Sequence, residues 1–195
     1  RGLPPLVAVI ADELRRAMAE VPFARFLQNQ APARQRLVAR LLRVNRCCVS
    51  PSRDRVDLLE HWPFDSARLL LLLRTVRIAL ADRDGYAPLA RLREPLAAAG
   101  FDHEFLTEHL VLDLLRRHGD FDLLPGGIVA ERGVGLARRI LSEARKVLRA
   151  QPLGLSLAQM LAERPDLAEF ECCLRELLHH DPLVQSQDGL RYQVI

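Results

Sequence analysis

The chain has 195 residues, a formal net charge of +3, 49% apolar residues and 27% charged residues. This balance excludes a mainly disordered chain, because leucine, valine and alanine are abundant enough to form a core. It also excludes a collagen-like protein and a disulfide-framework protein, and the length allows one or two average domains or several small ones.

A pattern of about 65 residues occurs three times along the chain, and internal repeats of this kind indicate a fold built from repeated structural units. In the first segment, apolar residues at helical spacing predict a helix from residue 6 to about residue 21, a short helix over 23–27 and a third helix over 32–44. Residues 47–59 then predict a hairpin, although Leu58 and Leu59 could equally begin a helical turn.

The middle segment follows the same order. Helices are predicted over 69–80 and 89–96, and a third helix is expected to be capped by Asp102 and to carry Phe105, Leu106, Leu110 and Leu114. A hairpin is predicted over 120–130, because Pro-Gly-Gly at 125–127 separates two short apolar runs.

The last segment is the clearest. It predicts a helix over 135–150, a short helix capped by Ser156, and a third helix that carries Leu174 and Leu177 on its inner stripe. Asp188-Gly189 between two alternating runs is a strong hairpin signal for residues 183–194.

Three helices followed by a β-hairpin is the element order of winged helix-turn-helix proteins, which all three segments resemble. The resemblance implies a mainly α fold of tandem winged-helix modules at 1–64, 65–131 and 132–195, with boundaries near 63–66 and 131–135. It rests on element order and hydrophobic spacing, and an irregular helical bundle with short hairpins is the alternative. Winged helices commonly place the third helix in the DNA major groove and the wing near the backbone.

Basic residues concentrate in the first module. Residues 1–60 hold 11 arginines against 6 acids, residues 61–130 hold 8 against 10, and residues 131–195 hold 9 basic residues against 9 acids. All but one of the basic residues in the chain are arginine, the exception being Lys146, and arginine-favouring codon usage explains that ratio as a whole. Only the positions of the arginines are therefore informative.

The third helix of the first module carries a basic strip. Arg36, Arg40 and Arg43 stand at i, i+4 and i+7 and share one face, with Leu37, Leu41 and Val44 expected beside them on a buried stripe. A strip of this kind suits nucleic-acid phosphates, but a solvated surface helix or an acidic protein partner would also explain it. The candidate nucleic-acid-binding residues are Arg34, Arg36, Arg40, Arg43, Arg46, Arg53 and Arg55.

The other two third helices are acidic. Asp102, Glu104, Glu108 and Asp113 lie in the middle module, and the last module carries four further acids at 166, 169, 171 and 176. Acid on these faces would repel phosphate. A second basic cluster lies between Arg132 and Arg149, on a helix that normally sits behind the recognition helix.

No motif for catalysis or for a cofactor is present. The sequence lacks G-x-S-x-G, a phosphate-binding glycine loop and metal-ligand spacings, so neither an enzyme nor a cofactor or metal site is expected. The cysteines occur as adjacent pairs at 47–48 and 172–173, which predicts reduced thiols and a cytoplasmic protein. The apolar run Leu69–Leu73 is far too short to span a membrane.

These observations predict a non-enzymatic DNA-binding protein. The first module would contact the phosphate backbone of duplex DNA, with RNA left open, and the later modules would mediate assembly through a protein partner or self-association. The alternative is a protein-docking subunit of a larger complex, similar to the tandem winged-helix proteins that bind kleisin subunits, with little or no direct DNA contact. In that case Leu69–Leu73, apolar on all sides, is either buried between modules or part of an interface.

Overall fold

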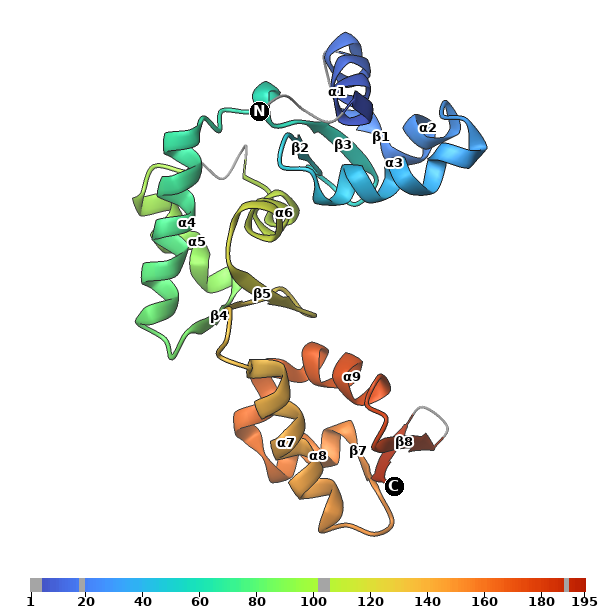
Figure 1. The fold of residues 1–195 in the computed structure, drawn as a ribbon. Coiled ribbons are helices and arrows are strands. Elements are labelled where there is room, and N and C mark those ends of the chain that lie inside the picture. Colours follow the sequence, from blue (N-terminus) through green and yellow to red (C-terminus); the bar gives the residue numbers. More distant parts are fainter. Residues whose placement is uncertain (1–4, 18–19, 102–105, 188–189) are drawn as a thin grey trace. The chain divides into compact units, whose positions relative to one another are not determined.

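The computed structural model describes residues 5–17, 20–101, 106–187 and 190–195. The described chain is mostly helical and carries small antiparallel sheets, which confirms the predicted mainly α class. One element order occurs three times along it: a helix, a short strand, two further helical segments and a two-stranded hairpin (Figure 1).

The bounds of the elements follow the sequence pattern closely. The first repeat comprises α1 (Pro5–Ala17), β1 (Val21–Pro22), α2 (Phe23–Gln28), α3 (Pro32–Val44), β2 (Cys48–Val49) and β3 (Arg55–Leu58). The second comprises α4 (Ser66–Ala81), β4 (Tyr86–Pro88), α5 (Arg93–Ala98), α6 (Glu108–His118), β5 (Phe121–Leu124) and β6 (Ile128–Glu131). The third comprises α7 (Leu136–Arg149), β7 (Leu155–Ser156), α8 (Leu157–Glu163), α9 (Glu171–His179), β8 (Val184–Gln187) and β9 (Arg191–Val194).

Each hairpin is joined by the short strand that follows the first helix of its repeat. The strand orders are β1-β3-β2, β4-β6-β5 and β7-β9-β8, so the last hairpin strand always lies in the middle. In the first sheet Val21 pairs with Val56 and Cys48 pairs with Leu58. A 3₁₀ turn starts at Leu59, directly after β3. The hairpin strand and the helical turn considered for residues 58–59 therefore both occur, with Leu58 in the strand and Leu59 in the turn.

The chain forms two compact units, residues 1–79 with 92–121 and residues 80–91 with 122–195. In the first unit, Ile10 and Leu14 of α1 pack with Val38 and Leu42 of α3 and with Val56 of β3. In the second unit, α7, α8 and α9 enclose a core that includes Ile140, Met160 and Leu174. The division into modules at 1–64, 65–131 and 132–195 stays a prediction.

Three predicted details are wrong. The buried stripe of α3 consists of Val38 and Leu42, whereas Leu37 and Val44 are 51% and 62% exposed. Leu37 directly precedes Val38 in the sequence, so spacing alone did not fix which of the two faces the core. Leu177 is only partly buried, while Leu110, Leu114 and Leu174 are fully buried as predicted.

The start of α6 also differs from the prediction. Leu106 lies outside the helix, and the hydroxyl oxygen of Thr107 caps it by accepting a hydrogen bond from the Leu110 backbone N–H at 3.2 Å. Asp102, Phe105 and the Asp188-Gly189 turn lie outside the described residues. The predicted cap at Ser156 is confirmed, because its hydroxyl and the side chain of Gln159 form a reciprocal capping box.

Truncation of the buried stripe tests this packing. Leu174→Ala removes a fully buried side chain from the core of the second unit, and we expect it to lower the free energy of unfolding by about 2–5 kcal/mol. Leu153→Ala, at a position that is 83% exposed, is the control and should change stability by less than about 0.5 kcal/mol. Urea unfolding measures both variants, and equal midpoints would contradict the assigned core.

Candidate nucleic-acid interface

The basic strip predicted on α3 faces solvent. Arg36, Arg40 and Arg43 are exposed, and on a helical wheel they lie opposite Val38 and Leu42, which anchor the helix in the core. Proline at the first position of α3 supplies a backbone angle that suits a helix start. The three guanidinium groups therefore stand on the outer side of a helix whose inner side is fixed.

The seven candidate arginines differ in what holds them. Arg34, Arg36, Arg40 and Arg53 are exposed, and their side chains make no hydrogen bond or ion pair with the rest of the described chain. Arg43 extends over the ring of Phe23, with its guanidinium carbon 5.7 Å from the ring centroid. Arg55 is bound by Glu20 at 2.6 Å, and Arg46 donates to the backbone oxygen of Arg117 at 3.1 Å. Arg46 and Arg55 are thus partly committed to the fold.

A buried ion pair on α6 lies directly behind this surface. Asp113 and Arg117 are spaced i, i+4, both are almost fully buried, and their nearest side-chain atoms are 2.6 Å apart. The Arg117 guanidinium also donates to the backbone oxygens of Leu42 and Asn45 at the end of α3, at 2.6 and 2.8 Å. The Asp113 carboxylate accepts the Ser50 backbone N–H at 2.8 Å. This pair fastens α6 to the end of α3 and to the first hairpin, beside which Figure 1 shows it.

The docked helix adds two basic side chains to the interface. Arg116 and His109 of α6 line a cavity of about 480 Å³ together with Arg43, Arg53 and Phe23 of the first repeat. Both α6 residues escape detection from the sequence pattern, because they lie more than 60 residues beyond the end of α3 along the chain. The i, i+4 spacing of Asp113 and Arg117 was a signal that this helix carries an internal ion pair rather than a row of surface acids.

Loss of Arg117 tests the role of the buried pair. Arg117→Met would leave the Asp113 carboxylate and two helix-end carbonyls without their donor, so we expect a loss of about 3–5 kcal/mol in unfolding free energy. Arg116→Met removes the same charge from the neighbouring exposed position and should cost less than about 0.5 kcal/mol. Similar melting temperatures for the two variants would show that the pair does not hold the unit together.

The second basic cluster is largely used within the fold. Arg145 of α7 donates two hydrogen bonds to the fully buried carboxylate of Asp181, at 2.5 and 2.7 Å. Lys146 pairs with Glu143 at 2.6 Å, and Arg139 lies over the ring of Tyr86. These side chains therefore offer far less free charge than their number in the sequence indicates.

The Arg145–Asp181 pair predicts a pH dependence of stability. Its hydrogen bonds hold the pKa of Asp181 below the usual value of 3.8, so its stabilising contribution is present above that value and is lost as the pH falls through the lowered pKa. Asp181→Asn should cost about 1–3 kcal/mol near pH 7, since a quarter of the Arg145 side chain reaches solvent. Urea unfolding of both proteins should show this difference unchanged down to about pH 5 and shrinking in stronger acid.

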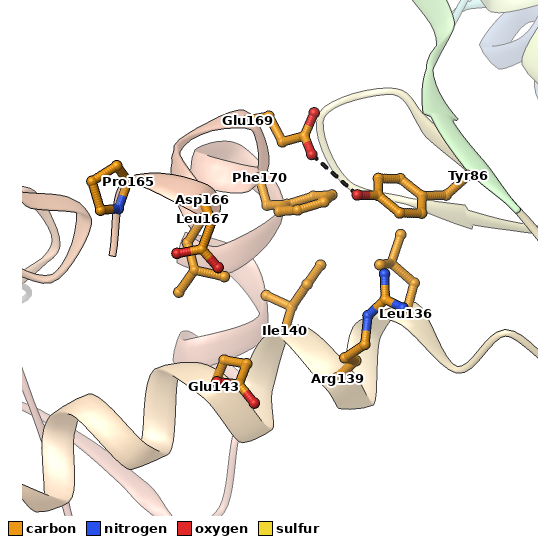
Figure 2. Close-up of a pocket in the computed structure, with 10 residues that line it drawn as sticks. All are labelled: Tyr86, Leu136, Arg139, Ile140, Glu143, Pro165, Asp166, Leu167, Glu169 and Phe170. Atoms are coloured by element: carbon orange, nitrogen blue, oxygen red, sulfur yellow. Dashed lines mark hydrogen bonds between the residues drawn. The ribbon is translucent and has the colours of Figure 1, made fainter. Parts of the chain in front are cut away.

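The second unit contains a cavity of about 520 Å³ between α7 and the segment Pro165–Phe170 (Figure 2). Its polar groups bond to one another. The Tyr86 hydroxyl donates to Glu169 at 3.2 Å, while burial and Glu169 raise the pKa of Tyr86 and so keep that proton in place. Arg164 binds both Glu143 and Asp166 at 2.7 Å. Two of the carboxylates that line this cavity, Glu143 and Asp166, are thus already paired with an arginine of the protein, and Glu169 accepts a tyrosine hydroxyl.

The third helices of the later repeats carry fewer free acids than the sequence indicates. Glu108 pairs with Arg93, and Glu171 pairs with Arg175 at 3.0 Å. The turn of the hairpin β5–β6 lies against α9, since a Cβ atom at Gly126 would be 3.0 Å from the Cβ of Cys172. The contact with the hairpin β5–β6 therefore covers part of the surface of α9, and the ion pair of Glu171 with Arg175 reduces the negative charge that α9 presents to a ligand.

Further observations bear on the kind of site. Among the described residues no group of three or more histidine, cysteine, aspartate or glutamate side chains has the arrangement of a metal site. All four cysteines are unpaired. None of the described helices combines the length and the hydropathy that a bilayer-spanning segment needs. No protein-family model matches the chain, and comparison with curated proteins gave no match.

Proposed function

We propose that the chain is a non-enzymatic, cytoplasmic protein of tandem winged-helix modules that binds the phosphate backbone of duplex DNA through α3. The observation that carries this proposal is the exposed stripe of Arg36, Arg40 and Arg43, which lies opposite the buried side of a helix with no acid from Ala24 to Arg53. Phosphates are neutralised by such a row of guanidinium groups. The proposed winged-helix class is supported by the element order and by the three-stranded sheets that the repeats have in common.

The contrast between the three third helices supports the same assignment. α6 is fastened by its buried ion pair to the first repeat, and its Thr107 hydroxyl also bonds the Pro51 backbone oxygen at 3.0 Å. α9 meets the turn of the hairpin β5–β6 near Cys172. The arginine stripe of α3 is exposed, so we assign the contact with DNA to α3 and the assembly role to the later modules.

A protein-docking role is the second candidate, and α4 favours it. Leu72 is buried, but Leu70, Leu71 and Ile78 are 66%, 45% and 54% exposed. The helix expected to be either buried between modules or part of an interface therefore exposes apolar side chains to solvent, which is a common property of interfaces. On this reading the protein binds duplex DNA only feebly, and the arginine stripe of α3 contributes nothing to that binding.

A salt titration separates the two candidates. Replacing Arg36, Arg40 and Arg43 together by alanine should flatten the slope of log affinity for duplex DNA against log salt concentration by about 3, because each phosphate that is no longer neutralised lowers the slope by about 1. Fluorescence anisotropy with a labelled duplex at several salt concentrations measures the slope. Running the same titration with duplex RNA tests the RNA alternative.

The matched control removes the same charge elsewhere. A variant with Arg74, Arg138 and Arg149 replaced by alanine loses three exposed arginines outside α3, so its slope should stay close to that of the wild type. Identical isotherms for the wild type and the α3 variant, with both proteins folded by circular dichroism, would rule out the DNA contact and favour docking through α4.

A further inference from the structure

The side chains that line the cavity between the first repeat and α6 include two chemical kinds, called here its basic wall and its apolar wall. One wall is basic and is formed by Arg53 of the first hairpin and by Arg116 and His109 of α6. The other wall is apolar and is formed by the ring of Phe23 and by the side chain of Val44. At about 480 Å³ the cavity has the size of a small-molecule site, because such sites span roughly 300–1,000 Å³.

Part of the positive charge of the cavity is not compensated within the described chain. Asp113 is the single carboxylate on its wall, and it is already bound by Arg117 and by the Ser50 N–H. Arg55 is bound by Glu20. Arg53 and Arg116 are exposed and have no partner among the described residues, so two guanidinium groups are available to bind a phosphate.

The apolar wall provides a surface against which a planar base can bind. Arg43 covers one part of the Phe23 ring, and Val44 beside it is 62% exposed. A planar base binds well against an aromatic ring and an arginine side chain, because every base has a π-face. A phosphate alone would use only the basic wall, whereas a phosphate attached to a base would use both.

We propose that this cavity binds a nucleotide, with its phosphate between Arg53 and Arg116 and its base against Phe23 and Val44. His109 supplies an imidazole N–H as a further donor to the phosphate. A free nucleotide and an unpaired nucleotide at the end of a DNA strand both present this combination of a phosphate and a base. Binding of a strand end rests on the proposed DNA-binding function, whereas binding of a free nucleotide does not.

The test uses adenosine 5′-monophosphate as the probe, with adenosine and inorganic phosphate as partial ligands. We expect the wild-type protein to bind the monophosphate at least about tenfold more tightly than either partial ligand, because each of them uses one wall only. Arg116→Gln should weaken binding of the monophosphate about tenfold, since it removes a charge-assisted hydrogen bond. Isothermal titration calorimetry measures all of these affinities.

The matched control is Arg74→Gln, which removes the same charge from an exposed position of α4 outside the α3 stripe and is not part of the cavity wall. Its affinity for the monophosphate should equal that of the wild type. Arg116→Lys keeps the charge and should retain part of the binding, which a purely structural role of Arg116 would not explain. No binding of the monophosphate to the wild type, or an equal weakening in Arg116→Gln and Arg74→Gln, would overturn the proposal.

Two duplexes distinguish the sources of the nucleotide. One has a 5′-phosphorylated single-nucleotide overhang and the other is blunt with a 5′-hydroxyl group. Tighter binding of the first duplex that Arg116→Gln abolishes identifies a strand end, whereas equal binding of both duplexes together with tight binding of the monophosphate identifies a free nucleotide. If the α3 stripe proves essential for duplex binding while the monophosphate does not bind, the nucleotide site is wrong and the proposed function stands.

Discussion

The buried ion pair between Asp113 and Arg117 is the constraint on which the candidate interface depends. Removing both charges from water costs free energy, which further hydrogen bonds of the two side chains offset. The Asp113 carboxylate accepts a backbone N–H of the first hairpin, and the Arg117 guanidinium donates to backbone carbonyls at the end of α3. The C-terminal end of a helix carries partial negative charge, which also favours a cation there. As a result, a helix from another part of the chain is held against α3 in one orientation, and its exposed neighbour Arg116 is brought to the same cavity as Arg53.

Much of the local structure could be predicted from the sequence. The bounds of α3 and α7, the hairpin around residues 125–127 and the cap at Ser156 follow from proline, glycine and capping signals that act over a few residues. The inner side of α3 could not be predicted, because Leu37 and Val38 compete for it and only the packing against α1 and β3 decides. The basic residues of α3 were identifiable as a local charge run. His109 and Arg116 were not, because only the folded chain brings them to the first repeat.

The net charge of each sequence segment differs from the unpaired charge that the same segment exposes on the folded surface. Acids that make the later segments neutral or acidic in sequence are bound by arginines: Asp181 by Arg145, Glu143 and Asp166 by Arg164. Conversely, the arginines of the cluster at 132–149 are partly consumed in the same way. Arg36, Arg40 and Arg43 of α3 stand out from this background because they share one exposed helix face and no carboxylate of the described chain pairs with them. The proposed assignment of DNA contact to the first module therefore depends on which charges lack partners, and less on how many each segment holds.

The turn at Gly126 has a consequence for how this sequence tolerates substitution over evolutionary time. Its φ of +80° already disfavours any residue with a side chain, and a Cβ there would also press against Cys172 at 3.0 Å. Gly133 has a similar backbone, with φ of +95°, but nothing lies within 4 Å of its added Cβ. A library of variants should thus accept asparagine or aspartate at position 133 more readily than at position 126. Among diverged descendants of this chain, glycine at 126 should persist for as long as the hairpin β5–β6 keeps its contact with α9.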